Sequence, residues 1–273
     1  MELWQIVVAL IQGLVEWLPI SSEGQVVLFL YNFTPVQSEE ILSFVVWLHL
    51  GTALAVVVRY PRLIFEILSL KDKKLFRHLL VATLATAITA VPLYFFLKDS
   101  LTREQGEFLN VLVGALLLVT AIILYLPTRE NEKEMPDTER EVEEKEAAAT
   151  GLVQGLAVLP GLSRSGVTIS ALLMQKIDKE TAMRFSFLMS VPAVIAILLL
   201  EIITGNTLPS ETGIVDFILI EGIVFVTGLL SMEFLLRLAR RFAFWKLCLL
   251  LAVIAILFGI PAIITLIRSF SGT

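Results

Sequence analysis

The sequence predicts an all-α integral membrane protein with six transmembrane helices and two re-entrant helix pairs, arranged as an inverted repeat. Of the 273 residues, 57% are apolar and 17% are charged, whereas soluble domains have about 45–50% apolar and about 25% charged residues. Six segments are apolar over the roughly 20 residues that a helix needs to cross a bilayer core. Two further apolar segments are interrupted by Gly, Pro and Ser and resemble each other.

The six predicted spans carry almost no charge. Backbone groups in lipid must be satisfied within the segment, so these runs should be helices. They cover residues 38–58, 77–97, 107–127, 180–203, 214–236 and 244–267.

Each interrupted segment is expected to form a helix, a break and a short helix. The first extends from Leu3 to Phe33, with its break at Pro19–Gly24, and the second extends from Ala147 to Met174, with its break at Pro160–Gly166. Each half is too short to cross a bilayer alone. Irregular backbone is tolerated at membrane depth only inside protein or beside water, so both segments are predicted to be re-entrant pairs.

Composition excludes several other classes of protein. Cys248 is the only cysteine, which excludes a disulfide framework and a thiolate metal cluster, and two histidines exclude a histidine-rich metal site. The net charge of −5 includes no basic stripe for nucleic acid. The chain starts with Glu2 after Met1, and no small-residue cleavage site follows, so a signal peptide is not expected.

The loops predict an orientation in the plasma membrane, because Lys and Arg mark the cytoplasmic side. Residues 59–78 hold six of these cations, and residues 128–146 and 237–246 hold four each. Residues 98–106 hold two and residues 204–213 hold none. With six spans, the three rich loops share the cytoplasmic side and both termini lie outside.

The loop at 128–146 also holds nine acidic residues, and we expect a solvated, partly helical connector there. A regulatory or metal-buffering segment is the alternative. The predicted organisation is a single membrane domain, with repeat 1 at about 1–127 and repeat 2 at about 147–273.

The repeat rests on matched motifs. Gln12-Gly13-Leu14 and Gln154-Gly155-Leu156 are each followed by Leu-Pro, two serines and a glycine, about 141 residues apart. The first unit has three spans, an odd number, so the second unit must insert upside down. Inverted repeats with broken helices place a site near the bilayer midplane, where the breaks meet. Transporters use this plan, and an enzyme acting on a lipid headgroup can use it as well.

The second break has the chemistry of an anion site. Ser163 is a good N-cap, and helix starts with free N–H groups attract anions. Arg164 adds a forked, permanently charged donor suited to phosphate. Ser165 and Thr168 add hydroxyls on one helix face. The alternative is an arginine that extends to the membrane interface.

The first break offers a base and a nucleophile. Glu16 lies four residues after Gln12 on the same helix face, so the pair could bind a divalent cation (Mg²⁺ or Ca²⁺), or Glu16 could act as a base. An interfacial carboxylate is the alternative. Ser21 and Ser22 open a second helix start, at which Ser21 is the candidate cap and Ser22 the candidate nucleophile.

Three further ionisable groups lie outside these motifs. His49 lies mid-span, and is either a core residue or, because the repeat brings it near the breaks, part of the site. His78 is expected to be solvated in the basic loop. Glu221 lies within the fifth span, where it either faces the cavity or pairs with an unidentified group.

At these residues the chain resembles the undecaprenyl-diphosphate phosphatase family, the bacitracin-resistance type of integral membrane phosphatase. The segment from Gln12 to Glu16 fits the family's Glu/Gln-x-x-x-Glu pattern, and the segment from Leu18 to Ser22 also matches. Pro160 to Thr168 fits the second signature over its whole length. Length, span count and the two re-entrant pairs also agree, so the resemblance covers nearly the whole chain.

The resemblance implies hydrolysis of a C55-type polyprenyl diphosphate to the monophosphate, which recycles the carrier lipid for cell-wall polymers such as peptidoglycan. It implies that Glu16 and Gln12 act with a divalent cation, that Ser22 is the nucleophile and that Arg164 binds phosphate. Candidate diphosphate-binding residues are Ser21, Gln25, Ser163, Ser165, Gly166 and Thr168. The expected partners are the lipid and the bilayer, with a homodimer left open and no nucleic acid.

One departure from the family concerns the general base. The family usually has Ser-Ser-Thr-Gly-His at the first break, but here Gln25 replaces the histidine and Glu23 replaces the threonine. The family commonly has glutamine where this chain has His49. We hypothesise that histidine and glutamine have exchanged places around one cavity. In the competing interpretations, Glu23 became the base or catalysis was lost.

A polyprenyl-phosphate transporter or flippase is the alternative function, because an inverted repeat also supports alternating access. A histidine-rich lipid phosphatase of the phosphatidate type is not expected, since neither His49 nor His78 lies in a suitable motif.

Overall fold

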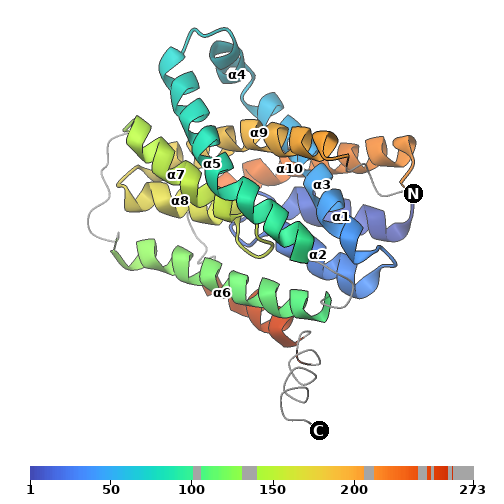
Figure 1. Ribbon diagram of the computed structural model, residues 1–273. Helices are drawn as coiled ribbons and strands as arrows, with labels where there is room; N and C mark the ends of the chain where they lie inside the picture. Colours follow the sequence, from blue (N-terminus) through green and yellow to red (C-terminus); the bar gives the residue numbers. More distant parts are fainter. Residues whose placement is uncertain are drawn as a thin grey trace.

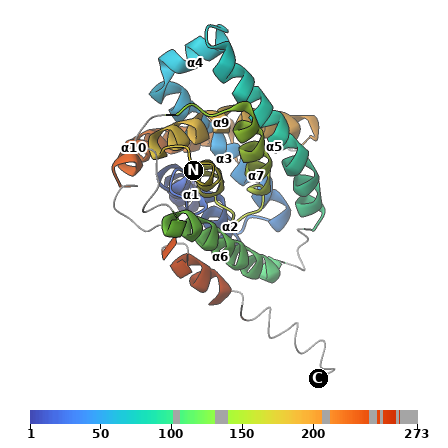
Figure 2. The same cartoon turned by 90° about the vertical axis from the view of Figure 1, so that its left-hand side faces the viewer.

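The computed structural model is all-helical over the residues that it describes, which are 1–100, 106–130, 140–205, 212–238, 245–246, 249–257 and 260 (Figure 1). The helices pack as a bundle, with α4 at one end and α6 on the opposite side (Figures 1 and 2). They are α1 (Leu3–Val15), α2 (Ser22–Phe33), α3 (Ser38–Arg59), α4 (Pro61–Leu68), α5 (Lys73–Ser100), α6 (Gly106–Glu130), α7 (Glu144–Leu156), α8 (Arg164–Met174), α9 (Lys179–Ile203) and α10 (Ile214–Leu238).

The predicted long helices match α3, α5, α6, α9 and α10 closely. Four of them (α3, α5, α9 and α10) are long and apolar enough to cross a membrane, and the apolar part of α6 described here is shorter, Asn110–Leu126. Half of the sixth predicted span lies outside the described residues, and 249–257 within it are helical. Residues 131–139 of the acidic connector also lie outside them.

The basic loop between α3 and α5 differs from the prediction. The short helix α4 starts at Pro61. Proline suits the first helical position because it has no N–H to leave unpaired and its φ is already helical. The next helix, α5, begins at Lys73 and includes His78, which is buried with 7% of its surface exposed. The expectation of a solvated His78 is therefore wrong, because the basic segment continues the helix.

Large apolar side chains on the outer helices face outward. Ile88 and Phe96 on α5, Ile203 on α9 and Val215 on α10 are all mostly exposed. Extended exposed apolar surface is rare on soluble monomers and normal where lipid is the solvent. This exposure matches the integral membrane class that the composition predicts.

Both predicted helix–break–helix segments are present, but their breaks begin earlier than expected. The first helix of each pair ends at Val15 or Leu156, and the second starts at Ser22 or Arg164. Each second helix is capped by the serine before it: the Ser21 Oγ accepts from the Gly24 N–H, and the Ser163 Oγ accepts from the Gly166 N–H, both at 3.1 Å. These caps fix where the second helix of each pair starts, because the serine has left-handed or extended backbone and the next residue is the first helical one.

The two broken pairs make matched contacts with the opposite half of the chain. In α1, a Cβ at Gly13 would lie 1.9 Å from Thr227 Oγ1 and 2.8 Å from the Val224 carbonyl of α10. In α7, a Cβ at Gly155 would lie 1.9 Å from Thr89 Oγ1 and 2.5 Å from a carbonyl of α5. Exchanged contacts of this kind are what a duplicated unit with a two-fold relation produces.

Gly13→Ala and Gly155→Ala should each destabilise the protein, because the new methyl group meets a backbone carbonyl. Overpacking typically costs about 1–3 kcal/mol. Gly222→Ala on α10 is the control, since nothing lies within 4 Å of a Cβ there. Thermal unfolding in detergent should show lower midpoints for the first two variants only, and a Gly222→Ala midpoint as low as theirs would contradict this packing.

Candidate active site

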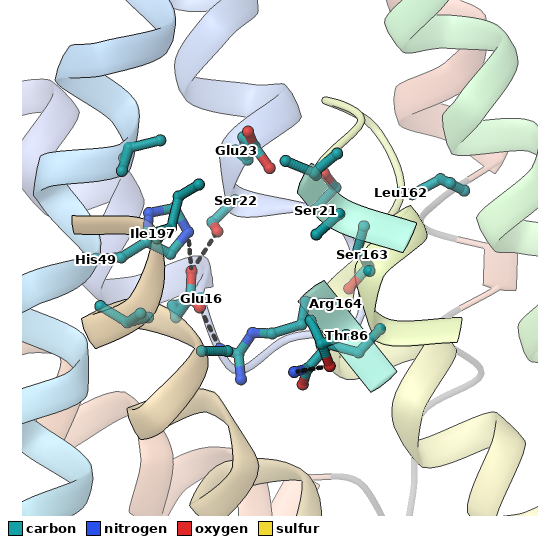
Figure 3. Close-up of a pocket in the computed structure, with 18 residues that line it drawn as sticks. Glu16, Ser21, Ser22, Glu23, His49, Thr86, Leu162, Ser163, Arg164 and Ile197 are labelled. Carbon is teal, nitrogen blue, oxygen red and sulfur yellow. Dashed lines mark hydrogen bonds and ion pairs between the residues drawn. The ribbon is translucent and has the colours of Figure 1, made fainter. Parts of the chain in front are cut away.

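The two breaks meet beside α3 and α9 and border a partly open cavity of about 130 Å³ (Figure 3). One part of its wall is polar and comes from both breaks and α3. The other part is apolar and comes mainly from α9 and the second break, with one residue each from α3 and α5. The lining residues most relevant to chemistry are Glu16, Ser21, Ser22, Glu23, His49, Thr86, Gln154, Ser163 and Arg164.

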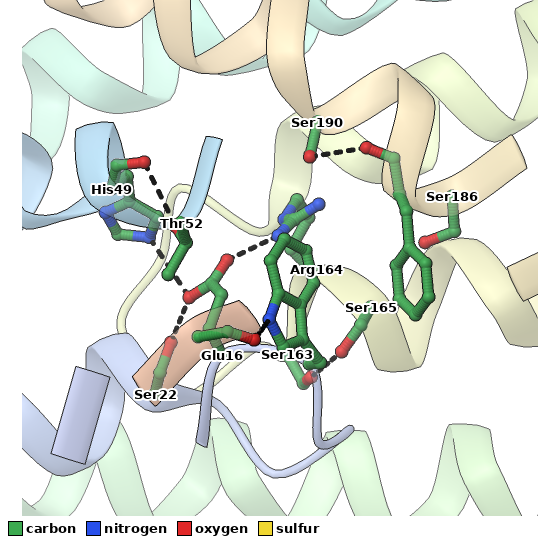
Figure 4. Close-up of polar contacts among 12 residues, drawn as sticks. Glu16, Ser22, His49, Thr52, Ser163, Arg164, Ser165, Ser186 and Ser190 are labelled. Carbon is green, nitrogen blue, oxygen red and sulfur yellow. Dashed lines mark hydrogen bonds and ion pairs between the residues drawn. The ribbon is translucent and has the colours of Figure 1, made fainter. Parts of the chain in front are cut away.

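The Glu16 carboxylate is the centre of the polar wall, although its side chain is almost fully buried. Its Oε2 accepts from the Ser22 hydroxyl at 2.5 Å and from the Gln12 amide at 2.9 Å. His49 Nε2 lies 3.6 Å from the same oxygen, and Arg164 forms an ion pair with Oε1 (Figure 4). A carboxylate this deep needs such partners, because desolvation otherwise disfavours its charge.

Arg164 still has a donor to offer. Its guanidinium lies over the Trp17 ring at 5.7 Å, and one of its terminal nitrogens pairs with Glu16. The other nitrogen, NH1, is buried and has no hydrogen-bond partner in the described part of the chain. An unpartnered guanidinium N–H beside a cavity suits a phosphate oxygen.

His49 is oriented toward Glu16 by its own helix. Its Nδ1 lies 2.8 Å from the Val45 carbonyl, and since a carbonyl only accepts, Nδ1 carries a proton. Nε2 is then the nitrogen that can exchange a proton with the groups around Glu16. The structure therefore brings an imidazole and Ser22 to the same carboxylate oxygen.

The position of Gln25 does not support the other half of the exchange hypothesis. Gln25 turns to the Ile20 carbonyl at 3.4 Å and is not among the residues lining the cavity. The cavity lining therefore includes His49 but not Gln25.

The serine and threonine residues divide by role. Ser21 accepts from both the Gly24 and Gly161 N–H groups at 3.1 Å, so it caps α2 and ties the two breaks together. Ser165 donates to the Leu18 carbonyl and Thr168 bonds Ser186, and neither lines the cavity. Of the predicted phosphate-binding hydroxyls, only Ser21 and Ser163 line the cavity, and both act as caps.

Glu23 lines the cavity without any hydrogen bond or ion pair to the described residues. It is next to Ser22 in sequence, but the Ser22 hydroxyl donates to Glu16. As a base for Ser22, Glu16 therefore has the better geometry.

The sequence did not single out two residues that line the cavity, Gln154 and Thr86, or Trp17, whose ring contacts Arg164. Gln154 donates to Thr86 Oγ1 at 3.0 Å, and its own amide oxygen is buried without a partner in the described structure. Trp17 packs under Arg164. The signal for Gln154 was its match to Gln12 in the repeat, whereas Thr86 and Trp17 carried no signal distinct from ordinary helix residues.

The predicted Glu16–Gln12 cation site does not fit these contacts. Gln12 presents its NH₂ group, a donor, to Glu16, and Arg164 already balances that carboxylate. Within the described residues no group of three or more His, Cys, Asp or Glu side chains is placed to hold a metal. The remaining carboxylate in the cavity wall is Glu23.

Comparison with known proteins agrees with this architecture. The family model described as bacitracin resistance protein BacA matches residues 5–259. The chain belongs to this family. A protein named undecaprenyl-diphosphatase from Methanopyrus kandleri is 36% identical over 269 residues, covering 96% of this chain and 97% of the relative.

Two further relatives carry the same name. The protein from Methanothrix thermoacetophila is 36% identical, covering 92% of this chain and 94% of its own. The protein from Christiangramia forsetii is also 36% identical, covering 86% of this chain and 89% of its own. Family membership therefore extends over both breaks and nearly the whole bundle.

Removing Arg164 alone should destabilise the fold, because it leaves the Glu16 carboxylate buried without its cation. Breaking a buried ion pair typically costs about 3–5 kcal/mol. We expect Arg164→Leu to lower the unfolding midpoint in detergent, and Arg164→Leu with Glu16→Leu to recover much of the loss. Equal midpoints for the single and double variants would show that the pair does not carry this stability.

Proposed function

We propose that this chain hydrolyses a polyprenyl diphosphate of the undecaprenyl type to the monophosphate and inorganic phosphate, and so recycles the carrier lipid for cell-envelope polymers. The observation that carries the proposal is the convergence of Ser22, His49 and Arg164 on one buried carboxylate, Glu16. Relatives with the printed name undecaprenyl-diphosphatase support the same activity.

The cavity suits an amphiphile. Its polar wall offers Arg164 NH1 as a free donor, and its apolar wall includes Val46, Val194 and Ile197. A diphosphate would bind at the arginine while the first isoprene units contact the apolar wall. Such a division between charged headgroup and apolar chain favours a lipid diphosphate over a soluble nucleotide.

In the proposed mechanism Ser22 is the nucleophile. Its Oγ forms a bond to the terminal phosphorus as the bond to the bridging oxygen breaks, and Glu16 takes the hydroxyl proton. The polyprenyl monophosphate leaves. Water then attacks the phosphoserine, Glu16 returns its proton to Ser22, and phosphate leaves with both protons of the water.

Arg164 and His49 support these steps. Phosphoryl transfer is accelerated mainly by positioning and by neutralising charge on the transferred group, which is the role proposed for Arg164. A phosphate bound at Arg164 NH1 would compete with Glu16 for the charge of the guanidinium, which would leave Glu16 a better base. His49, next to the shared oxygen, would stabilise the carboxylate or exchange the proton.

A divalent cation, Mg²⁺ or Ca²⁺, remains part of the proposal in a restricted form. The Gln12 amide donates to Glu16 and Arg164 pairs with the same carboxylate, which supports a cation that binds together with diphosphate oxygens and Glu23. The proposed location is the plasma membrane with both termini outside, which the distribution of Lys and Arg supports.

The first test is release of inorganic phosphate from a C55 or shorter prenyl diphosphate by purified protein in detergent. Ser22→Ala and Arg164→Ala should reduce kcat/KM by at least about 10³-fold, because each removes a group acting on the reacting phosphoryl. Gln25→Ala is the control and should stay within about threefold, since Gln25 lies outside the cavity. Lipid binding that needs Arg164, with no phosphate release by wild type, would favour the transporter.

The role of His49 has its own test. His49→Ala should lower kcat by about 10²-fold, in the range of general acid–base contributions. Gln25→His in that background should not restore activity, because position 25 faces the Ile20 carbonyl. Full activity in His49→Ala would exclude the imidazole and leave Glu16 as the only base in contact with Ser22.

The cation is tested by chelation. Removing divalent cations should weaken substrate binding, seen as a rise in KM, without lowering the unfolding midpoint of the free protein. A lowered midpoint would contradict this assignment, since it would require a metal site built by protein residues alone.

A further inference from the structure

Glu221 is a second carboxylate within the apolar helices, and the mechanism above does not use it. It lies on α10 with 7% of its surface exposed. Its Oε2 accepts from the backbone N–H of Gly51, in the middle of α3, at 2.6 Å, while its Oε1 is buried without a partner among the described residues. A buried acidic group at membrane depth that is only half satisfied is a poor way to stabilise a helix pair.

The contact depends on the glycine. A Cβ at Gly51 would lie 2.8 Å from the Glu221 carbonyl and 2.9 Å from Glu221 Oε2. Only a residue without a side chain lets α10 approach α3 so closely. One turn earlier, the rings of Trp47 and Phe217 meet edge to face at 5.8 Å.

These two contacts form a clamp on α3. Trp47 and Gly51 are four residues apart, as are Phe217 and Glu221, so the clamp holds one face of α3 along one helical turn. His49 lies between the two clamped positions and, at about 100° per residue, points roughly 200° away from both. The clamp therefore fixes the rotation of α3 that directs the imidazole toward Glu16 (Figure 4).

Helix α10 also contacts the segment that carries Glu16, the partner of His49. Trp17, next to Glu16, donates from its indole to the Gly228 carbonyl at 2.8 Å, and Ser231 donates to the Gly13 carbonyl at 2.7 Å. α10 thus touches α1 near Glu16 and α3 near His49. It spans both elements whose separation sets the 3.6 Å contact between the imidazole and the carboxylate.

We propose that Glu221 is a positioning residue for the reaction, acting through Gly51 and α3 to hold His49 against Glu16. This inference rests on the proposed function for its kinetic readout. It assigns Glu221 no contact with substrate.

The test combines Glu221→Leu with His49→Ala in the full-length protein. Glu221→Leu should lower kcat roughly tenfold with little change in KM, as a small misplacement of a catalytic group does. Its unfolding midpoint should not fall, because leucine removes an unpaired buried acceptor and the Gly51 N–H has a carbonyl acceptor within its own helix. Glu221→Gln keeps an acceptor oxygen and should retain most of the activity.

The double variant separates positioning from general stability. If Glu221 acts through His49, Glu221→Leu should have no further effect on kcat in the His49→Ala background. The matched control is Glu201→Leu, which removes another buried carboxylate, bonded to Ser43 and Tyr94, and should have the same effect in both backgrounds. An equal loss from Glu221→Leu in both backgrounds, or no loss in either, would overturn the proposal.

A second readout does not need turnover. The chain has two histidines, so ¹⁵N-imidazole NMR with His49→Ala assigns both ring signals. Glu221→Leu should shift the His49 signals and leave those of His78 in place. If Glu221→Leu shifts the His49 signals but the wild-type protein releases no phosphate, the proposed function is refuted and the positioning of His49 by Glu221 is kept. If the His49 signals do not change, the positioning role is refuted.

Discussion

The buried ion pair between Glu16 and Arg164 is the interaction on which the site depends. Each charge would be prohibitively expensive alone at this depth, and each comes from a different broken helix pair. The two breaks must therefore meet for either charge to be tolerated. Their meeting also brings Ser22 to the carboxylate and leaves one arginine nitrogen unpaired beside the cavity, so the constraint that stabilises the site also prepares it to bind an anion.

Glycine allows the helices to satisfy that constraint. Gly13 and Gly155 let each broken pair approach a long helix of the other half, and Gly51 lets α10 approach α3. In lipid, where apolar side chains gain little by leaving the solvent, such close backbone packing is a main source of helix association. The same contacts connect α10 to both Glu16 and His49, which makes the outer helix relevant to the chemistry.

The predicted repeat has different chemistry at its matched positions. Counting from Gln12 and Gln154, Ser22 corresponds to Arg164, and both are the first residues of their helices. Glu16 corresponds to Val158, and His49 to Ser190 at the slightly shorter offset of the next helix. Two equivalent helix starts thus converge on a single carboxylate. In the predicted repeat, one half therefore has the proposed nucleophile and the other half has the cation.

The sequence by itself determined the helical membrane class, the long helices, the two broken pairs and the residues Glu16, Ser22 and Arg164, because hydrophobic length, Gly-Pro-Ser breaks and charges in apolar helices are local signals. It also raised His49 as an alternative to Gln25. Only the tertiary structure decided that His49 reaches Glu16 and that Gln25, Ser165 and Thr168 do not line the cavity. The tertiary structure also decided that the Gln12 amide donates to Glu16 and that Glu221 accepts from the Gly51 N–H. The physical reason is that helix rotation and the choice of hydrogen-bond partner are set by packing between helices far apart in the chain.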